Sequence, residues 1–295
     1  MVEFSLQVQP ESAGEWLETA RRAEAAGFDA LLVADHPGVC VAPFVALAAA
    51  AAVTETIKLG SYVVNAGVRE PMLLATDVAT LDLISGGRAL LGLGAGHTPV
   101  EWEAVGRVRP DVRGRVDRCI AVAEATTRLL AGEKVSWDGD GLTMRDAELS
   151  KPPPVADKVP LLLGTANSRL LRWAGAHADI VGLSGLGRTR EDGHTHDARW
   201  RLEQIDAQVA LAREGGDATL EVLVQKVQPD LGEWTGDLGM SEEELRQVPF
   251  LLIGDEEELL AAVRRNRERW GITRYAVRRE ALDVLEPILP RLKAA

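Results

Sequence analysis

Short apolar runs alternate with helical patterns along almost the whole chain, which is the pattern of a parallel α/β sheet. The clearest unit runs from Ile57 to His97. Its two apolar runs, Ile57–Val64 and Arg88–Leu93, predict buried strands. Between them a helix is predicted from Pro71 to the Gly86-Gly87 pair that ends it. The apolar positions that recur there with helical spacing are Leu74, Val78, Leu81 and Ile84.

Eight such strand–helix units are counted from one end of the chain to the other, with no shift in composition that would mark a linker. The predicted strands are Phe4–Val8, Leu31–Ala34, Ile57–Val64, Arg88–Leu93, Leu161–Leu163, Asp179–Leu183, Leu220–Val227 and Arg274–Val277. Eight units in one chain predict an α/β fold, a (β/α)8 TIM barrel with insertions that forms a single domain over residues 1–295.

Four segments interrupt the repeating pattern. His97–Arg115 is predicted to be a surface excursion, and Lys134–Leu149 a β-hairpin around Asp138-Gly139-Asp140-Gly141. Gly185–Asp197, rich in glycine, arginine and histidine, is predicted to be a mobile loop at the catalytic rim. Trp234–Pro249 is predicted to be an insertion, in which Ser241 and Glu244 form a capping box.

A doubly wound dinucleotide-binding sheet is the alternative fold. Gly92-Leu93-Gly94-Ala95-Gly96 resembles a glycine-rich dinucleotide turn. However, no helix begins directly after it, and it follows the fourth strand rather than the first. The barrel therefore fits the pattern better.

Composition narrows the class of protein. Apolar residues make up 46% of the chain and aromatic residues only 4%, so the core is predicted to be mainly aliphatic. The net charge of −12 argues against a nucleic-acid or anionic membrane surface as partner. Two cysteines, an N-terminus without a basic signal region and the absence of a long apolar run predict a cytoplasmic protein.

Candidate catalytic residues lie where the predicted strands end, because a barrel places its active site at that face. Asp35-His36 follows the second strand, and a histidine there has a near-neutral pKa suited to proton transfer. The alternative is that Asp35 caps the following turn and His36 only packs there.

The third and fourth strands end in segments that could lie against a planar ring. Ser61–Asn65 offers backbone and the Asn65 amide, and Gly94-Ala95-Gly96-His97 lacks bulk at three of its four positions. His97 could contact substrate or cofactor. The alternatives are an ordinary strand end and a plain tight turn.

After the fifth strand, Gly164-Thr165-Ala166-Asn167 places small and hydroxyl residues at a helix N-terminus, a geometry that binds phosphate. Simple N-capping by Asn167 is the alternative and is compatible with it. His194 and His196 could bind a metal, but no further ligands accompany them, so no metal site is predicted. The common hydrolase and zinc motifs are absent from the sequence.

Together these segments resemble the bacterial luciferase-like superfamily and, within it, the oxidoreductases that use the deazaflavin coenzyme F-420 (F420). The stretches that carry the resemblance are Ala25–His36, Ile57–Gly96, Leu161–Gly185 and Ile253–Val277.

The resemblance implies a flavin-like ring held against the third and fourth strands. It implies a cis peptide at Tyr62–Val63, a cofactor contact at Asn65 and a phosphate tail at Thr165, Ala166 and Asn167. It also implies that His36 is the catalytic histidine. The chain differs from the deazaflavin sugar-phosphate dehydrogenases in having Gly38, Val39 and Cys40 where they have a tryptophan, and His97 where they have a glutamate.

We therefore expect hydride transfer between F420 and a small organic substrate, with His36 as general acid or base and Asp35 as its orienting partner. The substrate is expected in the mouth between Gly38–Pro43, His97–Trp102 and Gly185–Asp197. The nearest alternative is a monooxygenase that receives reduced FMN from a partner reductase. A non-catalytic flavin-binding protein and a metal-dependent hydrolase are more distant ones. A homodimer is compatible with the resemblance.

Overall fold

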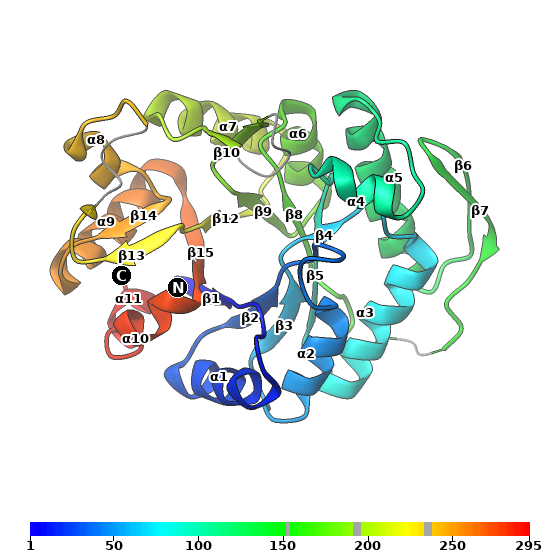
Figure 1. Cartoon of the computed structure of the whole chain (residues 1–295), viewed down its shortest axis with the longest axis horizontal. Coiled ribbons are helices and arrows are strands. Elements are labelled where there is room, and N and C mark those ends of the chain that lie inside the picture. Colours follow the sequence, from blue (N-terminus) through cyan, green and yellow to red (C-terminus); the bar gives the residue numbers. More distant parts are fainter. Residues whose placement is uncertain (152–153, 191–195, 233–237) are drawn as a thin grey trace.

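Eight parallel strand positions close into a barrel, and helices cover its outer face (Figure 1). The computed structural model describes residues 1–151, 154–190, 196–232 and 238–295. The strands around the barrel are β1 (Glu3–Gln7), β2 (Ala30–Val33), β3 (Lys58–Ser61) continued by β4 (Val64–Asn65), β5 (Ala89–Gly94), β8 (Leu161–Gly164), β9 (Ile180–Leu183), β12 (Thr219–Leu223) and β15 (Ile272–Arg278). The predicted (β/α)8 barrel is confirmed.

Parallel pairing between neighbouring strands runs all the way round the barrel. The first strand pairs with the last, with Phe4 opposite Tyr275, and β3 pairs with both β2 and β5. The predicted third strand, Ile57–Val64, is two short strands rather than one, because pairing stops after Ser61 and resumes at Val64. Between them the Tyr62–Val63 peptide bond is cis, as the resemblance implied.

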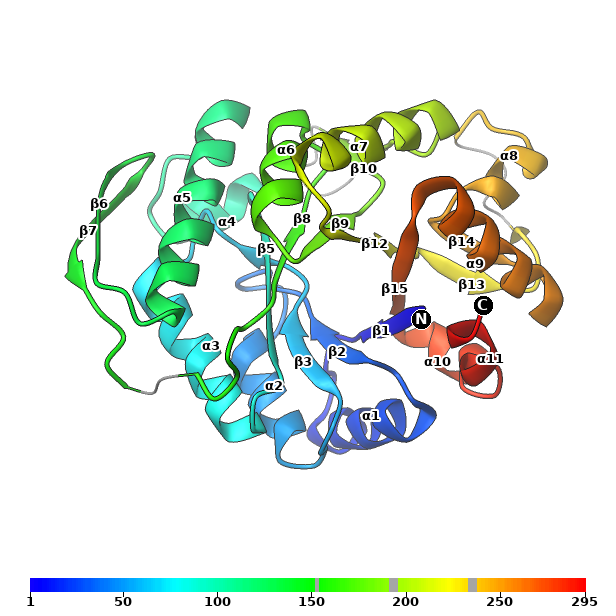
Figure 2. The same cartoon turned by 180° about the vertical axis from the view of Figure 1, so that it is seen from behind.

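The covering helices begin and end where local chemistry places them. The Ser12 hydroxyl accepts a hydrogen bond at the start of α1, Pro71 begins α3, and Gly86 ends α3 with φ of 70°. The helices around the barrel are α1 (Ala13–Ala26), α2 (Pro43–Ala51), α3 (Pro71–Ser85), α5 (Val112–Leu130), α6 (Ser168–His177), α7 (Leu202–Gly215), α9 (Glu256–Trp270), α10 (Leu282–Leu285) and α11 (Leu289–Lys293). Figure 2 shows the same ring of helices from behind.

The buried apolar side chains form three clusters, of which the third packs residues 135–149 against α3 and α5. Most buried side chains lie between the strands and the helices, whereas a smaller group that includes Leu32, Leu162 and Leu223 fills the barrel interior. Part of that interior is polar, because fully buried Glu221 pairs with Arg274 at 3.2 Å and Arg274 also contacts Glu3. The apolar reading of the strands did not predict this polar side of the barrel.

The predicted hairpin and capping box are confirmed. Strands β6 (Val135–Gly139) and β7 (Leu142–Ala147) form an antiparallel pair that lies outside α5 in both views (Figures 1 and 2). Ser241 and Glu244 make a reciprocal capping box at α8 (Glu242–Gln247). Residues 233–237 of the predicted insertion and Pro152-Pro153 lie outside the described residues.

Two predicted loops contain regular structure instead. The predicted surface excursion after His97 contains α4 (Pro99–Ala104), whose Glu101 and Trp102 are buried. In the predicted rim loop, the described residues include β10 (Leu186–Thr189) paired with β11 (His196–Ala198). Polar composition concealed both elements, because neither has an apolar period of its own.

Further elements extend the end of the chain. Strands β13 (Lys226–Gln228) and β14 (Leu251–Ile253) form a parallel pair beside the barrel, and a short 3-10 helix, η2 (Arg279–Ala281), follows β15. The last helical segment is divided into two short helices, α10 and α11, on either side of Pro287, because proline interrupts helical hydrogen bonding. None of the helices in the described residues combines the length and the apolar character needed to cross a membrane.

Arg88, 7% exposed, joins three elements at the amino end of the barrel. Its guanidinium donates to the carbonyls of Ala51 at the end of α2, of Thr54 and Ile57 between α2 and β3, and of Ser85 at the end of α3, at 2.7–3.1 Å. These carbonyls would otherwise be buried without partners.

Arg88→Met should lower the free energy of unfolding by about 3 kcal/mol, because several buried acceptors lose a charged donor at once. Urea unfolding followed by far-UV circular dichroism measures the loss. Arg172→Met is the matched control, since its ion pair with Glu214 is half exposed and should contribute less than about 1 kcal/mol. Equal losses in the two variants would contradict this account of Arg88.

Candidate active site

The carboxyl ends of the barrel strands surround one cavity of about 990 Å³. The residues predicted from the sequence all line it: Asp35, His36, Tyr62, Val63, Asn65, Gly94, Ala95, Gly96, His97, Gly164, Thr165, Ala166 and Asn167. The tertiary structure therefore brings together segments from the second, third, fourth and fifth strands, as expected for the functional face of a barrel. Whether each residue binds a ligand is a separate question.

Val63 forms the floor of the cavity between two glycines. A Cβ at Gly94 would lie 2.6 Å from a methyl of Val63, and one at Gly164 would lie 3.2 Å from the other. Side chains at these two positions would displace Val63. The floor is therefore a surface of one methyl-bearing side chain and bare backbone, held from below where Gln7 Nε2 donates to the Tyr62 carbonyl at 2.9 Å.

A three-residue network stands on one wall. His36 Nδ1 lies 2.7 Å from Glu101 Oε1, and Asn65 Nδ2 donates to the other oxygen of the same carboxylate. Glu101 and Asn65 are buried, whereas the His36 side chain is 37% exposed and borders the cavity. The imidazole is thus the member of the network that a ligand can reach.

The network sets the charges of its members. The hydrogen bond to Glu101 raises the pKa of His36 above its ordinary value, against the opposing effect of burial. Burial alone would raise the pKa of Glu101, but hydrogen bonds from His36 and Asn65 lower it below its ordinary value. Each member of the pair therefore stabilises the charged form of the other.

Asp35 has a different partner from the one predicted. Both of its carboxylate oxygens accept from Arg69, at 2.6 and 3.1 Å. One of them also accepts from the backbone N–H of Asn65 at 3.4 Å. The carboxylate in hydrogen-bond contact with His36 is therefore that of Glu101, and not that of Asp35 as expected. Asp35 instead ties Arg69 and the end of β4 to the end of β2.

Two further histidines extend from His36 across the cavity. The ring of His97 lies edge-on to His36 at 5.6 Å and to His196 of β11 at 4.5 Å. Burial, followed by the charges of His196 and His36, lowers the pKa of His97 to about 4, so His97 is neutral near pH 7. Among the described residues no three His, Cys, Asp or Glu side chains are placed to hold a metal ion, and His194 lies outside them.

The segment after β8 is a helix cap that faces the cavity. Asn167 Oδ1 accepts from the amides of Arg169 and Leu170, which is the N-capping alternative considered for this residue. Arg199 donates to the Ala166 carbonyl at 3.2 Å. Arg109, Arg115, Arg278 and Arg279 also line the cavity.

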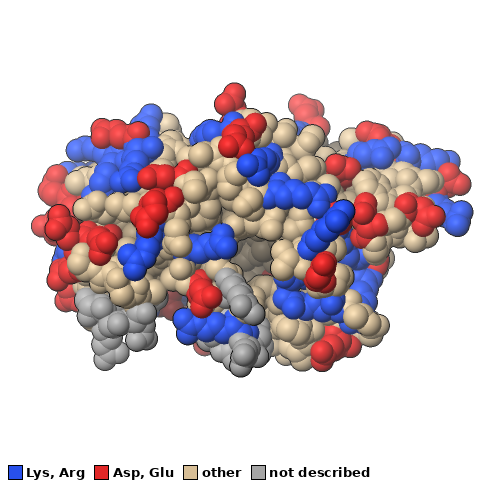
Figure 3. All heavy atoms as spheres, turned by 90° about the horizontal axis from the view of Figure 1, so that it is seen from above, with Lys and Arg blue, Asp and Glu red and all other residues tan. Residues whose placement is uncertain are grey.

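The outer surface carries both signs of charge. Figure 3 shows acidic and basic side chains interspersed over the face seen from above.

Glu101 and Arg69 are the site residues that sequence reasoning missed. Thr98-Pro99 before Val100-Glu101 is a weak helix-start signal, with an acid in the first turn of α4. That signal predicts a helix but not the burial of Glu101. Arg69 has no local signal, because only the fold brings it to Asp35, which precedes it by 34 positions.

Comparisons with known proteins agree with this geometry. The family model for luciferase-like monooxygenases matches residues 2–222. An F420-dependent glucose-6-phosphate dehydrogenase of Beutenbergia cavernae is 35% identical over 175 residues, or 56% of this chain and 51% of the relative. A 5,10-methylenetetrahydromethanopterin reductase of Archaeoglobus fulgidus is 29% identical over 286 residues, or 96% of this chain and 78% of the relative.

The fold has solved counterparts over its full length. The structure of the coenzyme F420 dependent tetrahydromethanopterin reductase from Methanopyrus kandleri aligns with a TM-score of 0.77 and 18% identity, covering 99% of each chain. The chain spans about half the length of the first of the two curated relatives, so their activities are not transferred as a whole. The match of the family model over residues 2–222 shows that this chain belongs to the luciferase-like monooxygenase family.

Proposed function

We propose that this protein is an F420-dependent oxidoreductase that transfers a hydride between the deazaflavin and a small organic substrate. The observation that carries the proposal is the His36–Glu101 pair beside a floor without bulky side chains, within one cavity of about 990 Å³. The name of the Beutenbergia cavernae relative, an F420-dependent dehydrogenase, supports F420 rather than FMN as the cofactor.

The lining residues fit a flat ring with an anionic tail. Gly94 and Gly96 make room for Val63 and for the Asn65 side chain, because a Cβ on either glycine would collide with them. A flat ring would lie against Val63 and this glycine-rich backbone, which line the cavity. Thr165, Ala166 and Asn167, with Arg115 and Arg199 nearby, would hold the phosphate-bearing tail. When bound, the deazaflavin supplies hydride exchange at its C5.

His36 is the residue proposed to move the proton. Because Nδ1 contacts Glu101, Nε2 is the nitrogen that exchanges a proton with the substrate. For an alcohol substrate, the carbon loses hydride and the hydroxyl proton passes to Nε2. In the opposite direction Nε2 returns that proton to the carbonyl oxygen. Glu101 holds the ring orientation and stabilises the imidazolium, the role the sequence alone had given to Asp35.

Cofactor binding separates this proposal from the flavin-dependent monooxygenase that the family description favours. We expect oxidised F420 to quench tryptophan fluorescence at concentrations at least about tenfold lower than FMN, a difference of about 1.4 kcal/mol. Titration of the purified protein with each cofactor measures this. Oxygen-dependent product formation with reduced FMN, measured with an oxygen electrode, would overturn the choice of F420.

The substitution Glu101→Gln should shift the pH dependence of kcat. Loss of the carboxylate lowers the pKa of His36, so the limb that reports His36 moves to lower pH, by about one unit, in either reaction direction. Kinetics between pH 5 and 9, and NMR titration of the His36 ring, measure the shift. Glu103→Gln, on the exposed side of the same helix, is the control and should leave the limb in place. An unmoved limb in Glu101→Gln would refute the assignment.

A homodimer is proposed through α2 and α3. These adjacent helices expose large apolar side chains, with Val45 73%, Leu73 67% and Ile84 50% exposed. Water-exposed apolar side chains of this size on neighbouring helices favour burial against a second copy. Light scattering after size exclusion should give a dimer for the native protein and a monomer for Leu73→Glu combined with Ile84→Glu. A native monomer would exclude this interface.

A further inference from the structure

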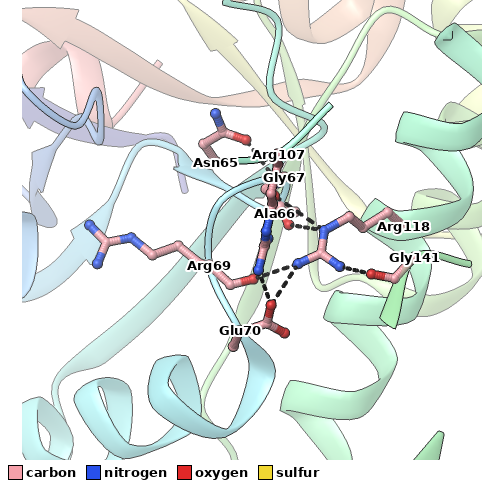
Figure 4. Close-up of polar contacts among 8 residues, drawn as sticks. All are labelled: Asn65, Ala66, Gly67, Arg69, Glu70, Arg107, Arg118 and Gly141. Atoms are coloured by element: carbon pink, nitrogen blue, oxygen red, sulfur yellow. Dashed lines mark hydrogen bonds and ion pairs between the residues drawn. The ribbon is translucent and has the colours of Figure 1, made fainter. Parts of the chain in front are cut away.

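A buried arginine outside the cavity holds the loop that carries two site residues. Residues 66–70 join β4 to α3, with Asn65 before the loop and Arg69 within it. Arg118 of α5, 3% exposed, donates from Nε to the Ala66 and Gly67 carbonyls at 3.1 and 3.3 Å. Its Nη2 donates to the Arg69 carbonyl at 3.2 Å. Figure 4 shows this guanidinium facing the loop backbone.

A second arginine and a glutamate complete the contact. Arg107 Nη1 donates to the Gly67 carbonyl at 2.6 Å, and its Nη2 pairs with Glu70. Glu70 also accepts from Arg118 at 3.3 Å. Three backbone carbonyls of one short loop, those of Ala66, Gly67 and Arg69, are therefore bound by two arginines (Figure 4). Glu70 partly offsets the positive charge of these arginines.

The opposite side of the loop rests on α4. A Cβ at Gly67 would lie 2.0 Å from the indole of Trp102, so the bare backbone of Gly67 is in close contact with that ring. Trp102 follows Glu101 directly and is 2% exposed. The loop thus lies between Arg118 on one side and the helix that presents Glu101 on the other.

The Asn65 side chain, directly before the loop, faces the site. Asn65 donates to Glu101, and its Oδ1 accepts from the Gly67 amide at 2.8 Å. The Ala66–Gly67 peptide unit therefore donates its N–H to Asn65 and accepts from Arg118 at its carbonyl. A displacement of the Gly67 backbone moves the acceptor that fixes the Asn65 amide.

We propose that Arg118 is a positioning residue of the active site, which acts through Asn65 to hold the Glu101 carboxylate against His36. The proposal deepens, and rests on, the proposed oxidoreductase function. Arg118 touches neither the cavity nor His36, so its effect on the reaction passes through the loop backbone.

The chemistry of the contact favours arginine over lysine. A guanidinium carries five N–H donors in a rigid plane, and Arg118 directs them at the loop, at Glu70 and at the Gly141 carbonyl of the hairpin. An ammonium keeps the charge but not these fixed directions. Burial lowers the pKa of Arg118, which reflects the cost of placing a cation here. Through its contacts with Gly141 and Ala66, Arg118 also connects the inserted hairpin to the loop.

A double-mutant cycle on kcat tests the route through Asn65. Arg118→Lys should lower kcat about tenfold in the native background, because small misplacements of catalytic groups reduce rates strongly. In the Asn65→Ala background the same change should lower kcat less than about twofold. Independent, multiplying effects would overturn the proposal. Rates are expressed per F420-binding site, so loss of folded protein does not enter them.

Two variants support the cycle. Glu70→Gln keeps the shape of the acceptor and removes its charge, so it tests the same contact if Arg118→Lys does not fold. It should lower kcat in the same direction, with the same loss of effect in Asn65→Ala. Arg128→Lys, on the same helix but 44% exposed in its pair with Glu133, is the control and should leave kcat unchanged.

A measurement without turnover separates this proposal from the proposed function. The side-chain amide protons of Asn65, assigned by their absence in Asn65→Ala, should shift in the NMR spectrum of Arg118→Lys and not of Arg128→Lys. Unchanged Asn65 resonances in Arg118→Lys would overturn the positioning role. Shifted resonances in a protein that neither binds nor turns over F420 would support the positioning role while the oxidoreductase proposal fails.

Discussion

The hydrogen bond between His36 and Glu101 is the contact on which the candidate site depends. It joins the end of β2 to a helix 65 positions later, and neither residue has this partner before the barrel closes. For Glu101 to reach the imidazole, α4 must lie over the mouth, which buries Trp102 against Gly67. A buried carboxylate needs donors, and His36 and Asn65 supply them. The hydrogen bonds that satisfy the buried Glu101 carboxylate are therefore the same ones that hold it against His36.

The floor of the cavity depends on side chains that are missing rather than present. Val63 fits between Gly94 and Gly164 because neither glycine has a side chain, and a Cβ at Gly94 would collide with it. A bare backbone surface suits a flat ring, for which close approach matters more than a specific polar contact. Polar groups stand elsewhere on the cavity wall, with His36 and Glu101 in one network and Arg199 beside Ala166. This arrangement is what connects the fold to the proposed hydride transfer with a separate proton.

Sequence reasoning reached the barrel and the cavity because both follow from local patterns and one general rule. Apolar strand runs and helix caps are encoded by near neighbours, and parallel strands in a barrel gather their carboxyl ends at one face. It failed where polarity hid structure, as in α4 and in β10 with β11, which have no apolar period. It also missed the polar barrel interior, since Glu3, Ser5 and Gln7 alternate with apolar residues in β1 in the manner of any half-buried strand.

The amino-acid sequence by itself determined the order of the elements, the closed parallel sheet and which segments would surround its mouth. Only the tertiary structure decided which side chains meet there. Asp35 and His36 are consecutive, and Pro37 favours extended backbone at His36, so the two side chains leave in different directions. Asp35 meets Arg69 and His36 meets Glu101. Such partners come from distant parts of the chain, and their meeting depends on how loops and α4 pack, which no local pattern encodes.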